Sequence, residues 1–244
     1  MPRYNLECVV LKSINYKDTD RIYTLYSKSK GKIAALAKGV RRISSRRSGN
    51  LDTLNHISVG ISESTSGYKT ISEVKSINTF KALKRSLAKA VYGYYISEIV
   101  HKFSLEGHEH PEIFDLLVHT LANLNSHGKD SRAVVAYFEI VLMKHLGYEL
   151  SLTKCASCGK NYSMEWSRVK FNYGLGGLVC DSCGGNGFDI SKETANTLYE
   201  LTVPNGRQFV VKDAINAATD IIKPYVEDIL EAKLKSVGMF KDVL

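Results

Sequence analysis

Four of the five cysteines in this chain are arranged as two Cys-x-x-Cys pairs, and no other feature constrains the fold as strongly. Cys155 and Cys158 form the first pair, Cys180 and Cys183 form the second, and a glycine follows each pair. Each pair can supply two thiolates from one tight turn, so the two pairs together complete a tetrahedral site of four sulfurs. The 21 residues between the pairs are slightly more than usual, and a hairpin would bridge them.

The two pairs predict one structural zinc ion, Zn²⁺. Four thiolates fill the coordination sphere, so no position remains to activate water. A redox pair or an iron–sulfur site would also use such cysteines, but redox motifs usually occur singly and iron–sulfur sites usually have other spacings. Cys8 lies in a predicted strand and is expected to be a small buried hydrophobic residue. His108 and His110 could also bind a metal, but we expect solvated residues in the loop before Pro111.

Residues 1–80 have the alternating pattern of β-strands, with turn residues between the runs. The predicted strands cover Tyr4–Leu11, Arg21–Tyr26, Lys32–Ala37, Leu54–Ile61 and Tyr68–Val74. Five short strands in a segment of this length predict a small barrel. An OB-fold and an SH3-like barrel share this size and strand count, so the pattern leaves both open.

After Phe80 the apolar residues recur at helical spacing. Helices are predicted over Leu87–Phe103, Pro111–Leu124 and Ser131–Leu146, from Ser191 onward, and over Asp213–Lys235 with a kink or break at Pro224. Residues 151–188 are irregular and rich in glycine, and they contain the cysteine pairs. We therefore expect an α+β multidomain chain. It has a barrel over 1–80 and an α-helical domain over 81–244, with the cysteine ribbon inserted at about 151–188.

The positive charge is concentrated in the barrel segment. Residues 1–80 carry 14 basic and 6 acidic residues, whereas residues 81–244 carry 19 of each. No Asp or Glu occurs between Arg21 and Leu51. Arginine side chains match phosphate geometry, so this run predicts contact with a nucleic-acid backbone rather than a merely solvated face. The residues expected to make that contact are Arg21, Lys32, Lys38, Arg41, Arg42, Arg46 and Arg47.

Several tyrosines are interleaved with these basic residues. Exposed aromatic side chains beside cations stack on the bases of single strands. The four tyrosines in question are Tyr4, Tyr16, Tyr23 and Tyr26. Strand alternation turns many such residues inward, so for each of them taken singly we favour a place in the core.

The sequence lacks the motifs of the common catalytic classes. It has no GxxxxGK[ST] loop and no GxGxxG, and Gly174–Gly177 is interpreted as a turn. Asp18 and Asp20 form the only close acidic pair of the barrel segment, and we interpret them as turn formers rather than Mg²⁺ ligands. We therefore predict a protein that is not an enzyme. The N-terminus lacks the apolar stretch of a signal peptide and no segment approaches a membrane span, so we expect a cytoplasmic protein with no membrane partner.

The chain resembles the bacterial RecO family of recombination mediators. The order of its parts is that of the family: a small barrel, a helical body, an inserted cysteine ribbon and a terminal helix. Local segments also match, over nearly the whole chain. They are Tyr16–Ile22 with Leu25, Gly31-Lys32, Ala37–Arg42, Phe171-Asn172, Gly176–Cys180, and Lys233–Ser236 with Phe240.

This resemblance implies an OB-fold N-terminal domain and a helical C-terminal domain that carries a zinc ribbon. It implies binding to single- and double-stranded DNA and annealing of complementary strands. It also implies help in loading RecA onto single strands coated by the single-stranded-DNA-binding protein. The implied protein partners are RecR and the C-terminal tail of that binding protein, and the implied location is the nucleoid.

Two other functions fit parts of the sequence. A zinc-ribbon adaptor that binds only protein would use its positive charge on an acidic partner and would not bind DNA in a salt-dependent way. A metal-dependent nuclease would show Mg²⁺-dependent turnover, but the sequence offers no convincing set of carboxylates for it.

Overall fold

The structure is a computed structural model that describes residues 2–43, 45, 47–184, 186–203, 212–231, 234 and 236 of the chain. Its contacts divide the chain into two compact units. The first unit comprises Met1–His127 with Leu234–Leu244, and the second comprises Gly128–Lys233. Among the helices in the described ranges, none combines the length and the apolar character that crossing a bilayer requires.

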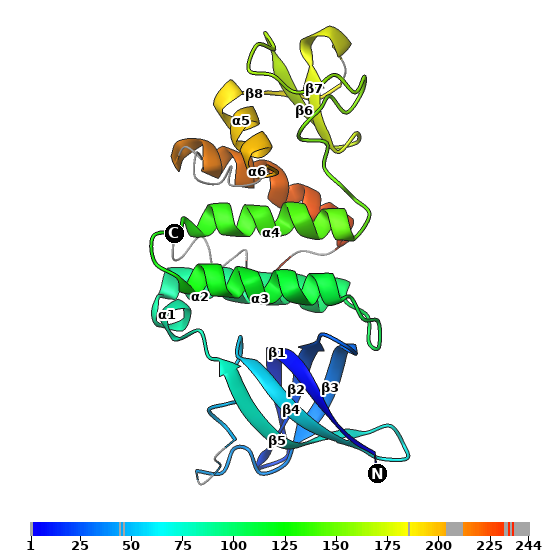
Figure 1. The fold of residues 1–244 in the computed structure, drawn as a ribbon, viewed down its shortest axis with the longest axis vertical. Coiled ribbons are helices and arrows are strands. Elements are labelled where there is room, and N and C mark those ends of the chain that lie inside the picture. Colours follow the sequence, from blue (N-terminus) through cyan, green and yellow to red (C-terminus); the bar gives the residue numbers. More distant parts are fainter. Residues whose placement is uncertain are drawn as a thin grey trace. The chain divides into compact units, whose positions relative to one another are not determined.

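The first unit begins with a closed five-stranded barrel (Figure 1). Its strands are β1 (Arg3–Tyr16), β2 (Asp20–Ser27), β3 (Gly31–Ala37), β4 (His56–Glu63) and β5 (Lys69–Asn78). The order around the barrel is β1-β2-β3-β5-β4, and β4 closes it by pairing with β1. Neighbouring strands are antiparallel except β3 and β5, which pair in parallel where Leu36 lies opposite Thr70. This is a barrel of the OB type, which decides between the two barrels that the strand pattern allowed.

Strand alternation fills the barrel as expected. In β3, for example, Ile33, Ala35 and Ala37 are buried while Ala34 faces outward. Cys8 in β1 is completely buried, as predicted for a small hydrophobic residue, and burial raises the pKa of its thiol to about 12.

Two of the four interleaved tyrosines also lie in the core. Tyr23 and Tyr26 in β2 are almost fully buried, so neither ring is available to stack on a base. Tyr4 is partly buried, and Tyr16 remains exposed at the end of β1. The prediction that each tyrosine lies in the core is therefore confirmed for the two β2 tyrosines and wrong for Tyr16.

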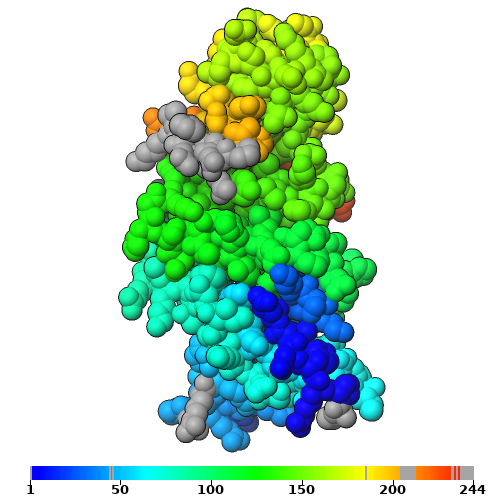
Figure 2. All heavy atoms as spheres, in the orientation of Figure 1, coloured from blue at the N-terminus to red at the C-terminus, as the bar shows by residue number. Residues whose placement is uncertain are grey.

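Three helices follow the barrel in the first unit: α1 (Lys81–Arg85), α2 (Leu87–Phe103) and α3 (Pro111–Asn125). The hydroxyl of Ser86 accepts a hydrogen bond from the Lys89 N–H and caps α2. Tyr26 joins the barrel to these helices, because its ring lies 6.4 Å from the ring of Phe103 and 6.4 Å from that of Phe114. In the space-filling view, the blue and cyan atoms of the barrel pass without a break into the blue-green atoms of the helices (Figure 2).

The second unit combines three helices with a small sheet. Its elements are α4 (Ser131–His145), β6 (Val169–Asn172), β7 (Gly177–Cys180), β8 (Phe188–Ile190), α5 (Lys192–Glu200) and α6 (Lys212–Ile229), with a 3₁₀ turn over Asp181–Cys183. The sheet has the order β7-β6-β8, and α6 packs against both α4 and α5.

Helix α6 runs through Pro224 without interruption, so the break allowed for there does not occur. Pro224 lies on the exposed side, and the buried residues Ile222 and Tyr225 on either side of it hold the helix against its neighbours. The predicted end of this helix at Lys235 lies outside the described residues.

Candidate metal centre and basic surface

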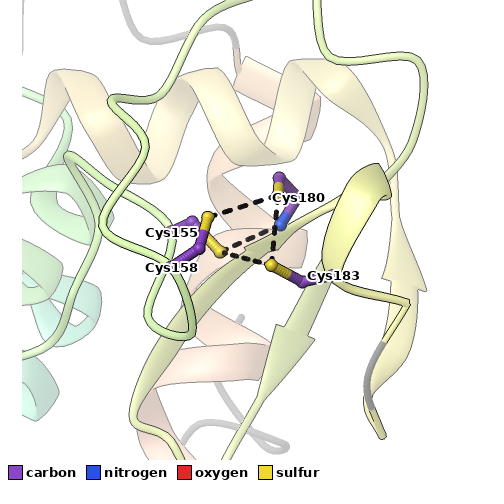
Figure 3. A group of neighbouring side chains, drawn as sticks. All are labelled: Cys155, Cys158, Cys180 and Cys183. Atoms are coloured by element: carbon purple, nitrogen blue, oxygen red, sulfur yellow. Dashed lines mark hydrogen bonds between the residues drawn. The ribbon is translucent and has the colours of Figure 1, made fainter.

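The four paired cysteines converge on one point in the second unit (Figure 3). Their sulfur atoms all lie within 4.8 Å of one another. The Sγ atoms are 3.8 Å apart for Cys155 and Cys183, 3.8 Å for Cys158 and Cys180, and 3.6 Å for Cys180 and Cys183. Four sulfurs at about 2.3 Å from a central ion would be about 3.8 Å apart, whereas a disulfide would bring two sulfurs to about 2.05 Å. The cluster therefore has the dimensions of a four-thiolate metal site and could bind a metal ion.

Local backbone structure places each pair. Cys155 and Cys158 lie in a tight turn in which the Gly159 N–H donates to the Cys155 carbonyl at 2.9 Å. Gly159 has a φ of 77°, which a residue with a Cβ rarely adopts. Cys180 ends β7 and Cys183 ends the 3₁₀ turn that follows it. The β6–β7 hairpin brings the second turn beside the first, so the hairpin expected between the pairs is confirmed.

The cysteines of the cluster differ in the pKa of their thiols. Burial opposes ionisation of Cys155, but the N–H groups of Cys180, Cys158 and Ser157 outweigh it and lower the pKa of the Cys155 thiol to about 6. The first of these bonds joins the Cys180 N–H to the Cys155 sulfur at 3.4 Å. Cys183 differs, since hydrogen bonding with the Cys158 thiol is the largest effect and raises its pKa to about 12. A divalent ion at the centre would favour the thiolate form of all four residues.

The two histidines considered as ligands are not part of this cluster. His108 is exposed, and the Nδ1 atom of His110 lies 3.6 Å from the Glu112 carboxylate. Across the residues that the structure describes, the four cysteines are the only group of three or more Cys, His, Asp or Glu side chains that could hold a metal.

The basic stretch forms the connection between β3 and β4, and residues 38–47 of it are called the basic loop below. The loop is fastened to the turn between β1 and β2. The carboxylate of Asp20 accepts a bond from the Gly39 N–H at 2.7 Å, and the Arg41 N–H donates to the Thr19 carbonyl at 2.9 Å. The Gly39 N–H also holds the pKa of Asp20 below its usual value. Asp20 is thus an anchor for the loop.

The cations of the basic loop are not equivalent. The Arg47 guanidinium donates to the carbonyls of Ile71 at 3.0 Å and Lys38 at 2.8 Å, and that of Arg41 donates to the Asp18 carbonyl at 3.0 Å. Within the described residues, the exposed side chains of Lys38 and Arg42 make no hydrogen bond and no ion pair. Lys38 and Arg42 are therefore free to contact a phosphate, whereas Arg47 also holds the loop in place. Arg46 lies outside the described residues.

The other two predicted contacts lie on strands. Arg21 is opposite Ala37 in the β2–β3 pairing and donates to Asn15 at 3.0 Å, so it lies beside the basic loop. Lys32 is the second residue of β3, about 17 Å along the strand from its end. Its ammonium donates to the His101 carbonyl at 2.8 Å, and partial burial lowers its pKa. The structure thus groups Arg21 with the loop cations and separates Lys32 from them.

One cation beside the basic loop was missing from the sequence prediction. Lys17 lies in the β1–β2 turn, and its ammonium is 5.4 Å from the centre of the exposed Tyr16 ring. The Arg41 guanidinium donates to the Lys17 carbonyl at 3.3 Å, which places the turn next to the loop. The adjacent Tyr-Lys pair was the available sequence signal, but only the fold shows which loop this turn meets.

The fold and the site together define a multidomain OB-fold protein with a candidate metal centre. The chain has an OB-type barrel with an unneutralised basic loop, followed by helices and a four-cysteine ribbon. A family model described as "Recombination protein O N terminal" matches residues 1–80. A second, described as "Recombination protein O C terminal", matches residues 84–237. The chain belongs to the recombination protein O (RecO) family.

Relatives with the name "DNA repair protein RecO" match along most of the chain. The protein of Geobacter sulfurreducens is 33% identical over 194 residues, which cover 79% of this chain and 78% of the relative. That of Alkaliphilus metalliredigens is 28% identical over 234 residues, covering 96% and 91%. That of Desulfatibacillum aliphaticivorans is 27% identical over 254 residues, covering 100% and 98%.

Proposed function

We propose that this protein is a DNA-repair and recombination mediator that binds single- and double-stranded DNA without catalysing a reaction. It anneals complementary strands and helps to load RecA onto single strands coated by the single-stranded-DNA-binding protein. RecR and the C-terminal tail of that binding protein are its proposed partners, and it acts at the nucleoid in the cytoplasm. The names of its relatives and its membership of the RecO family support this function.

The observation that carries the proposal is the basic loop. Lys38 and Arg42 are exposed on a loop whose backbone is held by Asp20 and Arg47, so their charges are presented from a fixed position. Contacts of this kind bind phosphates of any sequence and account for most salt-dependent affinity. Arg21, Arg41, Arg46 and Arg47 belong to the same proposed surface, and Lys32 has at most a peripheral part in it.

We further propose that residues 1–80 are the DNA-binding domain and that residues 81–244 form a helical domain with the ribbon at about 151–188. In that ribbon Cys155, Cys158, Cys180 and Cys183 bind one structural Zn²⁺. The tetrahedral spacing of the sulfurs and the all-thiolate donor set support zinc, which such sites bind without leaving an open coordination position.

Titration of a labelled oligonucleotide of mixed sequence, followed by fluorescence anisotropy across salt concentrations, tests the DNA-binding part of the proposal. We expect tight binding whose logarithm falls linearly with the logarithm of salt concentration. Annealing of complementary strands is the next assay. Absence of binding at low salt would reject the proposal and support an adaptor that binds only protein.

A further inference from the structure

An open groove runs along the barrel between β3 and β5. The two strands pair only where Leu36 lies opposite Thr70, so most of β3 has no strand partner on this side. The space beside it, called the β3–β5 groove here, has a volume of about 480 Å³. That volume falls within the ~300–1,000 Å³ of typical small-ligand sites. Its walls include Tyr4, Lys30, Lys32, Glu63, Tyr68 and Lys69.

Tyr68 supplies an exposed aromatic ring at this groove. Its side chain is 79% exposed, more than that of any other tyrosine in the chain. The loop that carries it is nevertheless fixed, because the Tyr68 N–H donates to the Ser64 hydroxyl at 3.0 Å and the Ser64 N–H donates to the Tyr68 carbonyl at 2.9 Å. An exposed aromatic ring on a backbone held in this way is a platform on which one base can stack.

The charges around the groove favour a phosphate. Three lysines and two acidic residues, Glu63 and Glu106, line it, and the ammonium of one of the lysines, Lys32, donates to the His101 carbonyl. Glu63 already accepts a hydrogen bond from the Tyr4 hydroxyl at 2.7 Å and pairs with Lys69 at 3.6 Å. The Lys30 ammonium lies 5.4 Å from the centre of the Tyr4 ring, and both residues line the groove. An aromatic ring flanked by lysines matches a nucleotide, with its base on the ring and its phosphate beside the lysines.

We propose that the β3–β5 groove binds one segment of single-stranded DNA, with a base stacked on Tyr68 and the backbone beside Lys30 and Lys69. The inference rests on the proposed DNA-binding function and divides that function between two surfaces. The basic loop contacts phosphates and so binds single and double strands alike. The groove needs an unstacked base, which a duplex does not offer, so it binds single strands in preference to duplexes.

Tyr68→Ala tests this division, because the side chain is exposed and its loss leaves the core intact. Anisotropy is measured with a labelled oligothymidine and with a blunt duplex of the same length, at the same salt concentration. We expect single-strand affinity to fall by about 5- to 150-fold, the factor that corresponds to ~1–3 kcal/mol for one stacked base. Duplex affinity stays unchanged, Tyr68→Trp restores single-strand binding, and the control Tyr94→Ala on α2 alters neither affinity.

Photo-crosslinking of a single strand that contains bromodeoxyuridine gives a second readout with the wild-type protein. We expect the crosslinked peptide to contain Tyr68. Equal losses on single strands and duplexes in Tyr68→Ala would overturn the proposal. Full single-strand affinity in that variant, with crosslinks only in the basic loop, would also overturn the proposal. An extended peptide would then be the favoured ligand of the groove. In either case the wild-type protein still binds DNA, whereas failure of the proposed function appears as no binding by the wild type.

Discussion

The carboxylate of Asp20 accepts a 2.7 Å hydrogen bond from the Gly39 N–H and so connects the start of β2 to the basic loop. Gly39 has a φ of 66°, a conformation that glycine adopts at little cost. The Asp20 carboxylate therefore binds the backbone of the loop. This position lets an acidic residue support a cationic surface without pairing with its side chains.

Two replacements of Asp20 separate the effect of its negative charge from the effect of its hydrogen bond to the loop. Asp20→Ala removes a negative charge, which alone would strengthen DNA binding, but it also frees the loop. We expect the loosened loop to dominate, so that DNA affinity falls and trypsin cleaves at Arg41 or Arg42 more rapidly. The matched variant Asp20→Asn keeps an oxygen acceptor and loses the charge, so it should bind DNA at least as tightly as the wild type. Identical behaviour of the two variants would show that the hydrogen bond has no part in DNA binding.

The arginines of the basic loop should differ in their effects on binding and stability. Arg42→Ala removes an exposed cation with no described partner, so we expect an unchanged melting temperature and a salt slope smaller by about 0.7 on a single strand. Arg47→Ala removes bonds to two backbone carbonyls, so we expect a lower melting temperature as well. Thermal denaturation and anisotropy titrations measure both quantities. A salt slope that Arg42→Ala leaves unchanged would exclude Arg42 from the DNA contact.

The cysteine cluster predicts the metal content of the protein. Cys155→Ser replaces one ligand of the four, and we expect loss of the bound metal and a lower melting temperature, since binding to such a site contributes folding free energy. Elemental analysis by mass spectrometry identifies the metal in the wild type and measures its loss. Cys8→Ala is the matched control, because Cys8 is buried in the barrel and is not part of the cluster. Full metal content in Cys155→Ser would contradict the assignment.

His101 should make stability depend on pH. Its Nε2 atom lies 2.7 Å from the Lys12 ammonium, which donates to it, so the imidazole is neutral in the fold. Burial, and then the charges of Lys12, Lys32 and Lys102, lower its pKa to about 4. In the unfolded chain a histidine titrates at about 6.5, so between these values the unfolded state binds a proton that the folded state does not. This contribution to stability is complete above pH ~6.5 and is lost as the pH falls toward 4.

Denaturant unfolding at several pH values tests this linkage. His101→Gln keeps an acceptor for Lys12 but cannot titrate, so we expect its unfolding free energy to fall less than that of the wild type as the pH decreases. The control His127→Gln changes an exposed histidine of the same unit and should follow the wild-type curve. Parallel curves of unfolding free energy against pH for the wild type and His101→Gln would show that His101 is not the source of the pH dependence.

Much of the fold was predictable because its local patterns and its tertiary structure agree. All five predicted strands are present, and α2 occupies the predicted Leu87–Phe103. The sequence did not predict α1, because a five-residue helix is too short for a periodic pattern. It also ended β1 too early. The pairing with β2 shifts between Val10 and Lys12, and this irregularity hides the continuation of the strand to Tyr16.

The candidate site was less predictable than the fold. The Cys-x-x-Cys spacing identified the four converging cysteines, because each pair is local in sequence. The basic residues depended on long-range geometry: Lys32 and Lys38 belong to one run in the sequence but lie at opposite ends of β3. The bond from Arg47 to the Ile71 carbonyl joins a loop to a strand that begins more than twenty residues later. No local sequence pattern predicts such a bond.

The contact between Glu98 and Ser236 makes the first unit discontinuous in the chain. The Glu98 carboxylate accepts bonds from the Ser236 N–H at 2.9 Å and from its hydroxyl at 2.6 Å, across 138 residues of sequence. During translation the barrel and α1–α3 leave the ribosome long before Ser236 is made. The first unit therefore acquires this contact only after the entire sequence of the second unit has been synthesised. A nascent chain stalled within residues 128–233 therefore contains α2 without the contact between Glu98 and Ser236.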